Sequence, residues 1–531
     1  MSLRFSDPFA TDRRRRFWRG GTLLALTAVA MRLSSLAFQV YLTRQLGGEG
    51  MGLLTLVLSI YGFAVTFATS GIHLSATRMA AGALGRGSDR ELRQAMRRCN
   101  LYALGFGCAA MGLLFWLAPL LAGKLLHDES LALPLRILSP ALPCIALSAS
   151  LNGYFTAVRR VHKSALKTLF EQGTKILLTV LGLRLLLPRG TGWACAAVVG
   201  GSSLAEVLSF LLSFLLYRRD LRRQIGHGGS PAVGLWRELC RIALPVAFTA
   251  YVRSGLLTVE HLLIPRGLIA YGIDRSTALA EYGCVQSMAL PVALFPLGVL
   301  ASFTGLLVPE FSEAQARGDR AAVDRLACRS LSLTLRCATL TAVLLSVFAL
   351  PLGEALFPGS RAGKFILGLA PLIPVMYFDT AVDAVLKGLG EQVYSMKVNI
   401  LDAAVSTLLV ATVLPLTGIA GYLPIIWATE WLNMGLSLRR VRKITELHLD
   451  LRSSFLRPLL SGCAACLAAK LCCDFLPFPQ IFRLVFGITS AAALCVFGLL
   501  CSGKRGCRSR AALSNSGFLG EKSCNLRESV L

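Results

Sequence analysis

Charged residues are scarce in this chain, and acids are scarcer than bases. Asp, Glu, Lys and Arg make up 16% of its 531 residues, and hydrophobic residues make up 54%. Soluble domains carry about 25% charged residues. Apolar runs of roughly 20 residues recur along the chain, and each is long enough to cross about 30 Å of hydrocarbon. The composition therefore excludes a soluble fold and predicts an all-α polytopic membrane protein.

Residues for metal or redox chemistry are also sparse. The six histidines are single and dispersed, with no spacing that is typical of a metal site. Cys463-x-x-Cys466 lies inside an apolar run, where small residues pack helices together. A membrane glycosyltransferase or phosphotransferase acting on lipid-linked sugars would need an acid-rich, metal-binding loop, and the sequence shows none. We therefore predict no catalytic residue, no metal and no cofactor, and we do not expect an enzyme.

A disulfide framework and a cleavable signal peptide are two further features that the chain lacks. The sixteen cysteines lie mostly within or beside apolar runs, where they act as small hydrophobes. The first apolar run is too long for a signal peptide, and Arg44 after it is not part of a small-residue cleavage site.

Basic residues, by contrast, are abundant, and the net charge is +26. Nucleic-acid binding is not the best explanation, because the positive residues are concentrated in short loops between apolar runs. Loops rich in Lys and Arg alternate with loops that have few of them, as expected when positively charged loops stay in the cytoplasm. This pattern predicts a plasma-membrane protein with both termini in the cytoplasm. The rich segments are 13–16, 86–98, 159–163, 218–223, 317–325 and 439–443.

The apolar runs predict about fourteen spans. They cover approximately 20–46, 51–84, 101–126, 133–158, 165–187, 193–217, 239–264, 284–309, 331–356, 365–386, 394–416, 419–438, 455–476 and 481–501. The domains that we predict are a basic cytoplasmic N-terminus (1–19), a six-helix bundle (20–217), a cytoplasmic linker (218–236), a second six-helix bundle (237–443), two extra helices (444–503) and a basic, disordered cytoplasmic tail (504–531).

The two bundles are predicted to be copies of one design. A Pro-x-x-Pro pair occurs at Pro140 and again at Pro371, 231 positions later. Glu171 and Asp402 are also 231 positions apart. Because prolines and acids share one offset, the chain has the internal repeat that is typical of secondary transporters.

Arginines in the middle of apolar spans are the strongest functional signal. Each costs about 2.5–3.5 kcal/mol to insert, so an unpaired one facing lipid is not expected. Arg32 and Arg253 lie near the middle of the first span of each half, and Gln39 shares a helical face with Arg32. They predict a cationic, water-filled cavity between the halves, although ion pairs that only fasten helices together would also explain them. Arg44 and Arg78 are further substrate-binding candidates, but both lie near span ends, where snorkelling is the simpler explanation.

Acids within the spans are candidates for ion coupling. Asp379 and Asp383 are one helical turn apart on one face, and Glu260 lies in the seventh span. Two close carboxylates could share a proton or bind Na⁺, which would couple transport to a gradient of H⁺ or Na⁺. Neutralisation of the pair by Lys387, four residues further on, is the structural alternative.

Several motifs together resemble the polysaccharide-biosynthesis flippases, a MATE-like family of the MOP superfamily. The resemblance covers about Gly20 to Lys443 and starts with Arg32 in the first span. The other motifs that carry it are Tyr41-Leu-Thr-Arg44, Leu46-Gly-Gly-Glu-Gly-Met-Gly-Leu53, Asn152-Gly-Tyr-Phe155, Ala243-Leu-Pro245, Leu263-Ile-Pro-Arg266, Ala289-Leu-Pro291, Leu307-Val-Pro-Glu310, Ser312-Glu-Ala314 and Gly388-Leu-Gly390.

The resemblance implies two six-helix bundles that face each other across a central cavity. It implies that the substrate is an undecaprenyl-pyrophosphate-linked saccharide, a class that includes the peptidoglycan precursor for the spore cortex. The family's basic residue in the first helix corresponds to Arg32, whereas Ser35 and Phe38 replace a Gly and a second basic residue found in relatives. The two extra spans resemble a helix pair that offers a groove to the lipid tail.

The residues and the resemblance together predict a flippase that works by alternating access, with a lipid-linked sugar pyrophosphate and membrane lipids as partners. A cation-coupled multidrug antiporter of the same fold is the nearest alternative, favoured by Asp379 and Asp383 but opposed by Arg32 and Arg253. A non-transporting scaffold of the envelope or sporulation machinery is an alternative of another class.

Overall fold

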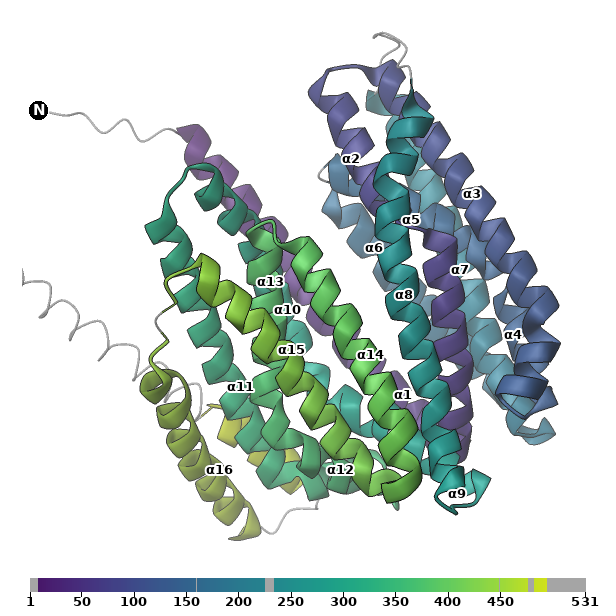
Figure 1. The fold of residues 1–531 in the computed structure, drawn as a ribbon, viewed down its shortest axis with the longest axis vertical. Coiled ribbons are helices and arrows are strands. Elements are labelled where there is room, and N and C mark those ends of the chain that lie inside the picture. Colours follow the sequence, from purple (N-terminus) through teal and green to yellow (C-terminus); the bar gives the residue numbers. More distant parts are fainter. Residues whose placement is uncertain (1–7, 159, 225–233, 448, 476–481, 494–531) are drawn as a thin grey trace, which may run out of the picture.

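The protein folds into helices throughout the described part of the chain. The computed structural model describes residues 8–158, 160–224, 234–447, 449–475 and 482–493. Within these ranges every regular element is a helix and none is a strand. Figure 1 shows two bundles that lie side by side, close together at one end and spread apart at the other. The all-α prediction is confirmed, whereas the predicted tail from residue 504 lies outside the described residues.

Helices of the first half begin with a single long helix that is sharply bent. Gly47 interrupts α1 with φ 70° and ψ −177°, a conformation that residues with a side chain rarely adopt. The predicted spans 20–46 and 51–84 are therefore joined by a kink between two helical segments. The helices of this half are α1 (Pro8–Thr69), α2 (Ile72–Gly85), α3 (Asp89–Leu120), α4 (Ala132–Leu138), α5 (Ala141–Ala157), α6 (Val161–Leu186) and α7 (Thr191–Gln224), and the π-helical turn η1 (Leu121–Leu125) continues α3.

The second half is built in the same way. Its helices are α8 (Leu235–Ala270), α9 (Arg275–Gly283), α10 (Leu290–Ala316), α11 (Arg320–Leu356), α12 (Ala362–Leu369), α13 (Ile373–Gly388), α14 (Gln392–Thr417) and α15 (Tyr422–Ile444), with the π-helical segment η4 (Cys284–Ala289) between α9 and α10. After this half, α16 (Arg457–Phe475) packs on α11, and a short apolar helix covers Phe482–Ala493.

The predicted repeat is visible in where the helices start. Helices α3, α6 and α7 begin 231 positions before α11, α14 and α15, the same offset that the sequence showed. The starts of α3 and α11 are also capped alike. Ser88 accepts a hydrogen bond from the backbone N–H of Glu91, and Asp319 accepts one from Ala322. The two bundles are therefore pseudo-symmetric copies.

The helices are long and apolar enough to cross a membrane. Ten candidate spans meet both criteria within the described residues. Two of them, 57 and 53 residues long, are each broken, the first at Gly47 and the second at Gly418–Gly421, and each corresponds to two predicted spans. Helix α6 is not among the ten, and the number of crossings stays a prediction.

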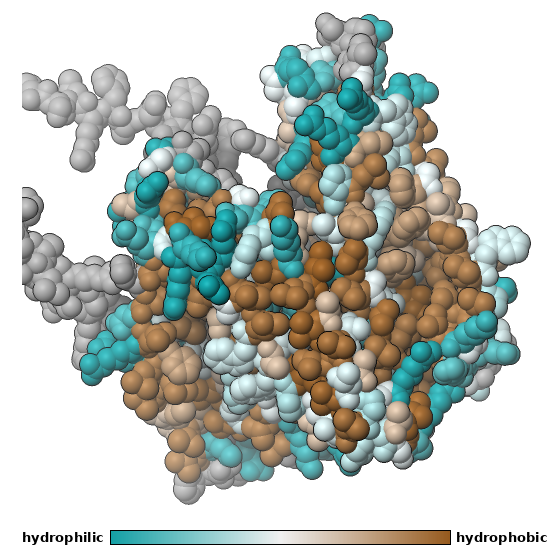
Figure 2. Space-filling model, viewed as in Figure 1, coloured by the Kyte–Doolittle hydropathy of each residue, from teal (hydrophilic) through white to brown (hydrophobic). Residues whose placement is uncertain are grey.

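The surface supports the membrane assignment. In Figure 2 hydrophobic residues form a broad band across the face shown, and hydrophilic residues gather toward its two ends. Large apolar side chains are also exposed on the described helices, among them Trp116 of α3 (81% exposed) and Leu416 of α14 (78%). Apolar exposure of this extent is not stable in water, so we assign the band to lipid contact.

The two bundles meet closely at the end where α1 bends, which we call the closed end. Gly48 and Gly52 of α1 pack on the turn formed by Leu279–Gly283 of α9. A Cβ on Gly52 would collide with the carbonyl of Leu279, and one on Gly283 would lie 2.6 Å from the carbonyl oxygen of Gly48. Small residues thus let the two backbones touch, as at close helix crossings in membranes.

At the opposite end, which we call the open end, the bundles separate. This end carries the α2–α3, α5–α6, α10–α11 and α13–α14 connections (Figure 1). In the space-filling view the surface is notched between the two bundles there (Figure 2). The molecule is therefore wedge-shaped, open at one end and closed at the other.

Candidate functional site

The arginine of the first span lies between the two bundles. Gln172 of α6, in the first bundle, donates a hydrogen bond to Ser35 of α1 at 3.4 Å. One turn away, Arg32 lies directly on Gly298 of α10, in the second bundle, where a Cβ would approach its Cζ to 2.8 Å. This part of α1 is therefore in contact with both bundles, and the absence of a side chain at Gly298 leaves room for the guanidinium.

Within the described part of the chain, no acid lies against Arg32. Its side chain is exposed, and among the described residues no carboxylate lies within ion-pair distance of it. Its neighbours are a glycine and, further away, the ring of Tyr377. The alternative in which this arginine is locked in a structural ion pair is not what the described residues show.

The arginine of the seventh span occupies a comparable position on α8. Its neighbour Ser254 accepts a hydrogen bond from Thr66 of α1 at 3.1 Å, and Leu256 accepts one from Thr407 of α14 at 3.3 Å. Helix α8 therefore also touches both bundles. The exposed Arg253 lies within electrostatic range of Asp402 on α14, but within the described ranges it forms no ion pair.

The structure gives the positions of Gln39 and Arg78 but does not show what either side chain would bind. Gln39 is half-buried two turns after Arg32, and its carbonyl accepts a hydrogen bond from Thr43 at 2.9 Å. Arg78 is exposed on α2. Neither side chain is shown near a feature that would bind a substrate, so their predicted roles stay predictions.

Arg44 and Arg266 both lie at the closed end, and each donates a hydrogen bond to a backbone carbonyl of the opposite half. Arg44 donates a hydrogen bond to the carbonyl of Ala355 at 3.2 Å, at the end of α11 in the opposite half. Arg266, at the end of the first helix of the second half, donates to the carbonyl of Lys124 at 3.1 Å, at the end of η1 in the first half. Lys124 and Ala355 are 231 positions apart. Each arginine thus caps the end of an equivalent helix in the other half, α11 for Arg44 and the η1 continuation of α3 for Arg266, which explains Arg44 more directly than substrate binding does.

The two neighbouring acids proposed for ion coupling, Asp379 and Asp383, have different partners in the structure. Asp383 forms an ion pair with Lys387 at 2.5 Å and accepts a hydrogen bond from Ser395, as the structural alternative expects. Asp379 accepts one hydrogen bond from Asn433 at 3.2 Å, and its other oxygen is buried without a hydrogen-bond partner in the described structure. Of this pair, Asp379 is the one whose binding capacity is not satisfied.

Two further acids of the second bundle, Glu260 and Asp402, lie within electrostatic range of each other, and Asp402 is also within range of Asp379. Glu260 of α8 accepts a hydrogen bond from Ser406 of α14 at 2.7 Å. One oxygen of Asp402 is buried and has no hydrogen-bond partner in the described structure, like that of Asp379. Across the described residues, no three His, Cys, Asp or Glu side chains are close enough to hold a metal ion.

A cluster of charges in the first bundle was not selected from the sequence. Lys167 is buried and pairs with Glu171 at 2.6 Å, and Ser209 of α7 donates to the same carboxylate oxygen at 3.1 Å. Lys175 and Glu206 lie within electrostatic range of them. The signal was the four-residue spacing of Lys167, Glu171 and Lys175 on α6, which places all three on one helical face.

Comparison with known proteins identifies the family. The family model described as "Polysaccharide biosynthesis protein" matches residues 17–315, more than half of the chain. The chain belongs to the polysaccharide biosynthesis protein family. Stage V sporulation protein B of Bacillus subtilis (strain 168) is 24% identical over 411 residues, covering 76% of this chain and 79% of that protein.

Solved structures show that the fold of this polysaccharide biosynthesis protein is that of the MOP superfamily. "Lipid II flippase MurJ, inward closed conformation" is similar over 92% of this chain and all of that chain, with a TM-score of 0.69 and 13% identity. An inward-facing multidrug resistance MATE family transporter of the MOP superfamily covers 79% of this chain and 98% of its own, with a TM-score of 0.61 and 14% identity. The chain therefore shares its fold with these membrane proteins.

Proposed function

We propose that this protein flips an undecaprenyl-pyrophosphate-linked saccharide across the plasma membrane by alternating access. The headgroup would pass between the bundles while the lipid tail stays in the bilayer. Similarity to stage V sporulation protein B and to a lipid II flippase favours a peptidoglycan precursor, including one for the spore cortex, over other saccharides.

The observation that carries this proposal is the position of Arg32 and Arg253. Each lies on a helix that touches both bundles, each is exposed, and within the described ranges neither is in an ion pair. A guanidinium group binds phosphate oxygens with two parallel hydrogen bonds. A pyrophosphate leaving water needs such partners, because an unpaired charge in a low-dielectric space is very costly.

The extra helix α16 supports a lipid-linked substrate. It packs on α11, where Gly462 meets Leu340 and Val343. Its other side carries Leu460, Leu467 and Leu471, each at least 55% exposed. We assign this apolar surface to contact with acyl chains, including the tail of the substrate.

We propose that the open end faces the cytoplasm. Basic residues gather at helix ends there, including Arg86 at the α2–α3 connection and Arg442 at the end of α15 (Figure 1). Positive loops remain in the cytoplasm. In this orientation both termini are cytoplasmic and the wedge opens toward the side on which precursors are made.

Reconstituted liposomes test the proposal. The full-length protein, its Arg32→Gln and Arg253→Gln variants and an Arg184→Gln control would be assayed for flipping of a lipid-pyrophosphate-sugar. Arg184 is an exposed arginine near the end of α6 and is not one of the predicted binding residues. We expect each site variant to lose on the order of tenfold in rate, because one charge-assisted contact to phosphate is worth about 1.5–3 kcal/mol.

Three results would contradict the proposal. Undiminished flipping by both site variants would remove Arg32 and Arg253 from the site. Equal losses in the Arg184→Gln control would show that any lost surface arginine impairs the protein. Absence of flipping by the unmodified protein, with folding verified, would favour the scaffold alternative.

A cation-coupled antiporter of the same fold is the second candidate. The unsatisfied buried oxygens of Asp379 and Asp402 favour it, because they could take a proton or contribute to binding Na⁺. Efflux of cationic drugs from cells that make the protein, with no flipping of the lipid-linked sugar, would decide in its favour. In the flippase proposal the same acids supply coupling to H⁺ or Na⁺.

A further inference from the structure

Helix α6 presents two sides of different chemistry. Lys167, Glu171 and Lys175 are spaced four residues apart and therefore share one side of the helix. Leu166 and Leu177 are 52% and 60% exposed, and both are about half a turn around the axis from Lys175. We assign the leucine side to lipid contact, so the charged side faces the inside of the molecule.

Contacts with the neighbouring helices support this orientation. Ser209 of α7 donates a hydrogen bond to Glu171 at 3.1 Å, and Gln172 donates one to Ser35 of α1 at 3.4 Å. Lys175 is one turn beyond Glu171 and Gln172, so it lies on the side of α6 that faces α7 and α1. The first bundle therefore holds a cation on its inner side, next to the first segment of α1.

The charges on this side of α6 do not cancel. The carboxyl group of Glu206 on α7 lies within hydrogen-bonding reach of that of Glu171. Two carboxyl groups this close share one proton, so together they carry a single negative charge. Lys167 balances this charge through its ion pair with Glu171 at 2.6 Å. Lys175 is attracted to both acids, but within the described residues it forms neither an ion pair nor a hydrogen bond.

The side chain of Lys175 is also accessible. It is half-buried, whereas the side chain of Lys167 is buried. Because the lipid-facing side of α6 is the opposite one, the accessible part of Lys175 faces an internal space. The N–H groups of its ammonium are therefore available to an anion that enters this space.

Lys175 lies closer to the closed end than Arg32 does. The first segment of α1 and helix α6 both run toward the closed end (Figure 1). Arg32 is one turn before Ser35 and Lys175 is one turn after Gln172, so the two cations are separated by roughly 9 Å along the helices. Gln39, one turn after Ser35, is at the level of Lys175. The two cations therefore mark two successive depths along the same pair of helices.

The repeat shows that the fold does not require a lysine at this position. The residue that corresponds to Lys175, 231 positions later, is Ser406 of α14, and the one that corresponds to Lys167 is Val398. Ser406 donates a hydrogen bond to Glu260 at 2.7 Å. The equivalent side of α14 thus binds a carboxylate where α6 presents a cation, so the inner sides of the two bundles differ in charge.

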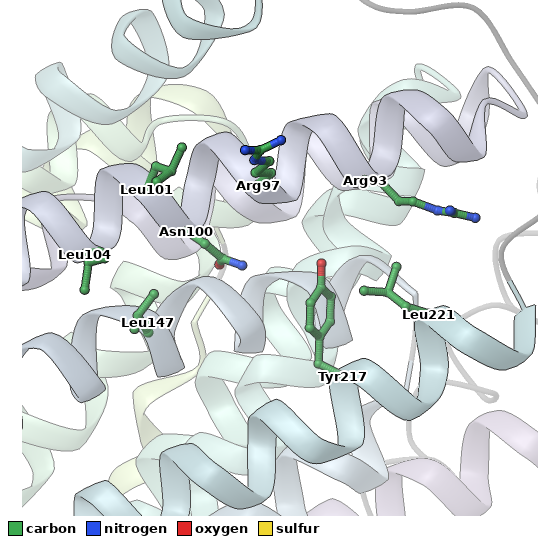
Figure 3. Close-up of a pocket in the computed structure, with 8 residues that line it drawn as sticks. All are labelled: Arg93, Arg97, Asn100, Leu101, Leu104, Leu147, Tyr217 and Leu221. Atoms are coloured by element: carbon green, nitrogen blue, oxygen red, sulfur yellow. The ribbon is translucent and has the colours of Figure 1, made fainter. Parts of the chain in front are cut away.

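A groove on the first bundle, among α3, α5 and α7, is not a competing site for an anion. Figure 3 shows its lining residues, among which Leu101 and Leu104 form part of an apolar wall. The side chain of Arg97 points away from Asn100 and Tyr217 (Figure 3). This groove therefore offers a headgroup no converging set of polar groups.

We propose that Lys175 binds the pyrophosphate of the substrate at a second, deeper position, after the headgroup has passed Arg32. Lysine suits this role because its ammonium is a compact charge with several donors on a flexible stem. The uncompensated charge and the internal exposure of Lys175 supply the binding energy and the access. The inference deepens the proposed function and rests on it, because it needs a pyrophosphate between the bundles.

Reconstituted liposomes with the full-length protein test this inference, with the lipid-pyrophosphate-sugar as the substrate. The variants are Lys175→Gln, the charge-conserving Lys175→Arg and, for comparison, Arg32→Gln. The matched control is Lys397→Gln, which changes an exposed lysine of α14, the helix that corresponds to α6. Thermal unfolding of each variant in detergent separates a loss of transport from a loss of stability.

We expect Lys175→Gln to slow flipping by on the order of tenfold, because a charge-assisted contact is lost. The loss should persist at saturating substrate, since Arg32 still captures the headgroup, whereas more substrate should partly rescue Arg32→Gln. Lys175→Arg should keep most of the rate, and the unfolding midpoint of Lys175→Gln should be unchanged.

Four results would overturn the inference. In a protein that flips the substrate, an unchanged rate in Lys175→Gln would exclude Lys175 and leave the flippase proposal standing. A lower unfolding midpoint, with Lys175→Arg as slow as Lys175→Gln, would give this lysine a structural role. An equal loss in Lys397→Gln would show that the effect is not specific to this position. Absence of flipping by the unmodified protein would remove both proposals together.

Discussion

Two carboxylates of the second bundle, Asp379 and Asp383, differ in their hydrogen-bond and ion-pair partners, although the sequence suggests that they act as a pair. Asp379 and Asp383 share a helical face, but Lys387 and Ser395 satisfy Asp383, whereas Asp379 keeps a buried oxygen without a hydrogen-bond partner in the described structure. We predict that Asp379→Asn removes the dependence of transport on a gradient of H⁺ or Na⁺. The amide can keep the contact to Asn433 but has no negative charge for a cation.

Flipping rates measured with imposed pH and Na⁺ gradients would check this prediction. Asp383→Asn is the matched variant, because it removes an ion pair on the same helix face and should lower stability while leaving the gradient dependence in place. Full gradient dependence in Asp379→Asn would assign coupling to another group, and Asp402 would be tested next for the same reason.

Much of the candidate site could be read from the sequence at this scale, because a charge inside an apolar span is conspicuous. Arg32 and Arg253 were selected on that basis and lie between the bundles. What sequence could not supply is the partner of each charge. Arg44 contacts the carbonyl of Ala355, which is 311 positions away in the sequence. The sequence around Arg44 and the sequence around Ala355 do not predict this contact.

Helices cross most closely at the closed end, and glycine makes this possible. Gly52 of α1 faces the backbone of Leu279, and Thr55, one turn further on, shares a hydrogen bond of 2.5 Å with Ser287 of η4. We predict that Gly52→Ala lowers stability by about 1–3 kcal/mol, because its Cβ has no free space and one backbone must move. Thermal unfolding in detergent would measure the loss.

Gly435 on α15 provides the control for this substitution. It is exposed, and a Cβ there meets no atom within 4 Å. Gly435→Ala should be neutral or slightly stabilising, because alanine has a higher helix propensity than glycine. Equal effects of the two substitutions would show that the crossing at Gly52 tolerates a side chain.

Helices were largely predictable because the apolar runs have bilayer length, and the offset of 231 between Pro140 and Pro371 returns in the starts of α3 and α11. The sequence predicted two separate spans, 20–46 and 51–84, but the structure keeps helical geometry on both sides of Gly47. A run of glycines in the sequence predicts that the chain changes direction. The geometry of the bend depends on the helix that packs against the glycines, which here is α9.

The whole molecule is a wedge whose closed end is fastened by a reciprocal pair of arginines. Arg44, from the first half, caps α11 in the second, and Arg266, from the second half, caps η1 in the first. Arg275 adds hydrogen bonds to Leu126, at 3.2 Å, and to Asp128, at 3.3 Å, in the same region. All of these contacts join the two halves, so they must break if the closed end opens during alternating access.

We therefore predict that Arg44→Gln and Arg266→Gln shift the protein toward a state that is open at this end. Each charge-assisted hydrogen bond to a carbonyl contributes about 1.5–3 kcal/mol, enough to change the ratio of two states by tenfold or more. Hydrogen–deuterium exchange would report the shift as faster exchange in α9 and in the last turn of α11. The Arg184→Gln variant, which lacks a contact across the halves in the described structure, should exchange like the unmodified protein.

The pseudo-symmetry of the two contacts makes this prediction specific. Because each arginine caps an equivalent helix end, the two single variants should speed exchange in the same helices and to a similar degree, and the double variant should exceed both. If only one substitution had an effect, the arginines would act as separate local caps and not as a matched pair. If the effect were confined to the end of the helix that lost its cap, the closed end would be held by the glycine crossing and the Arg275 contacts.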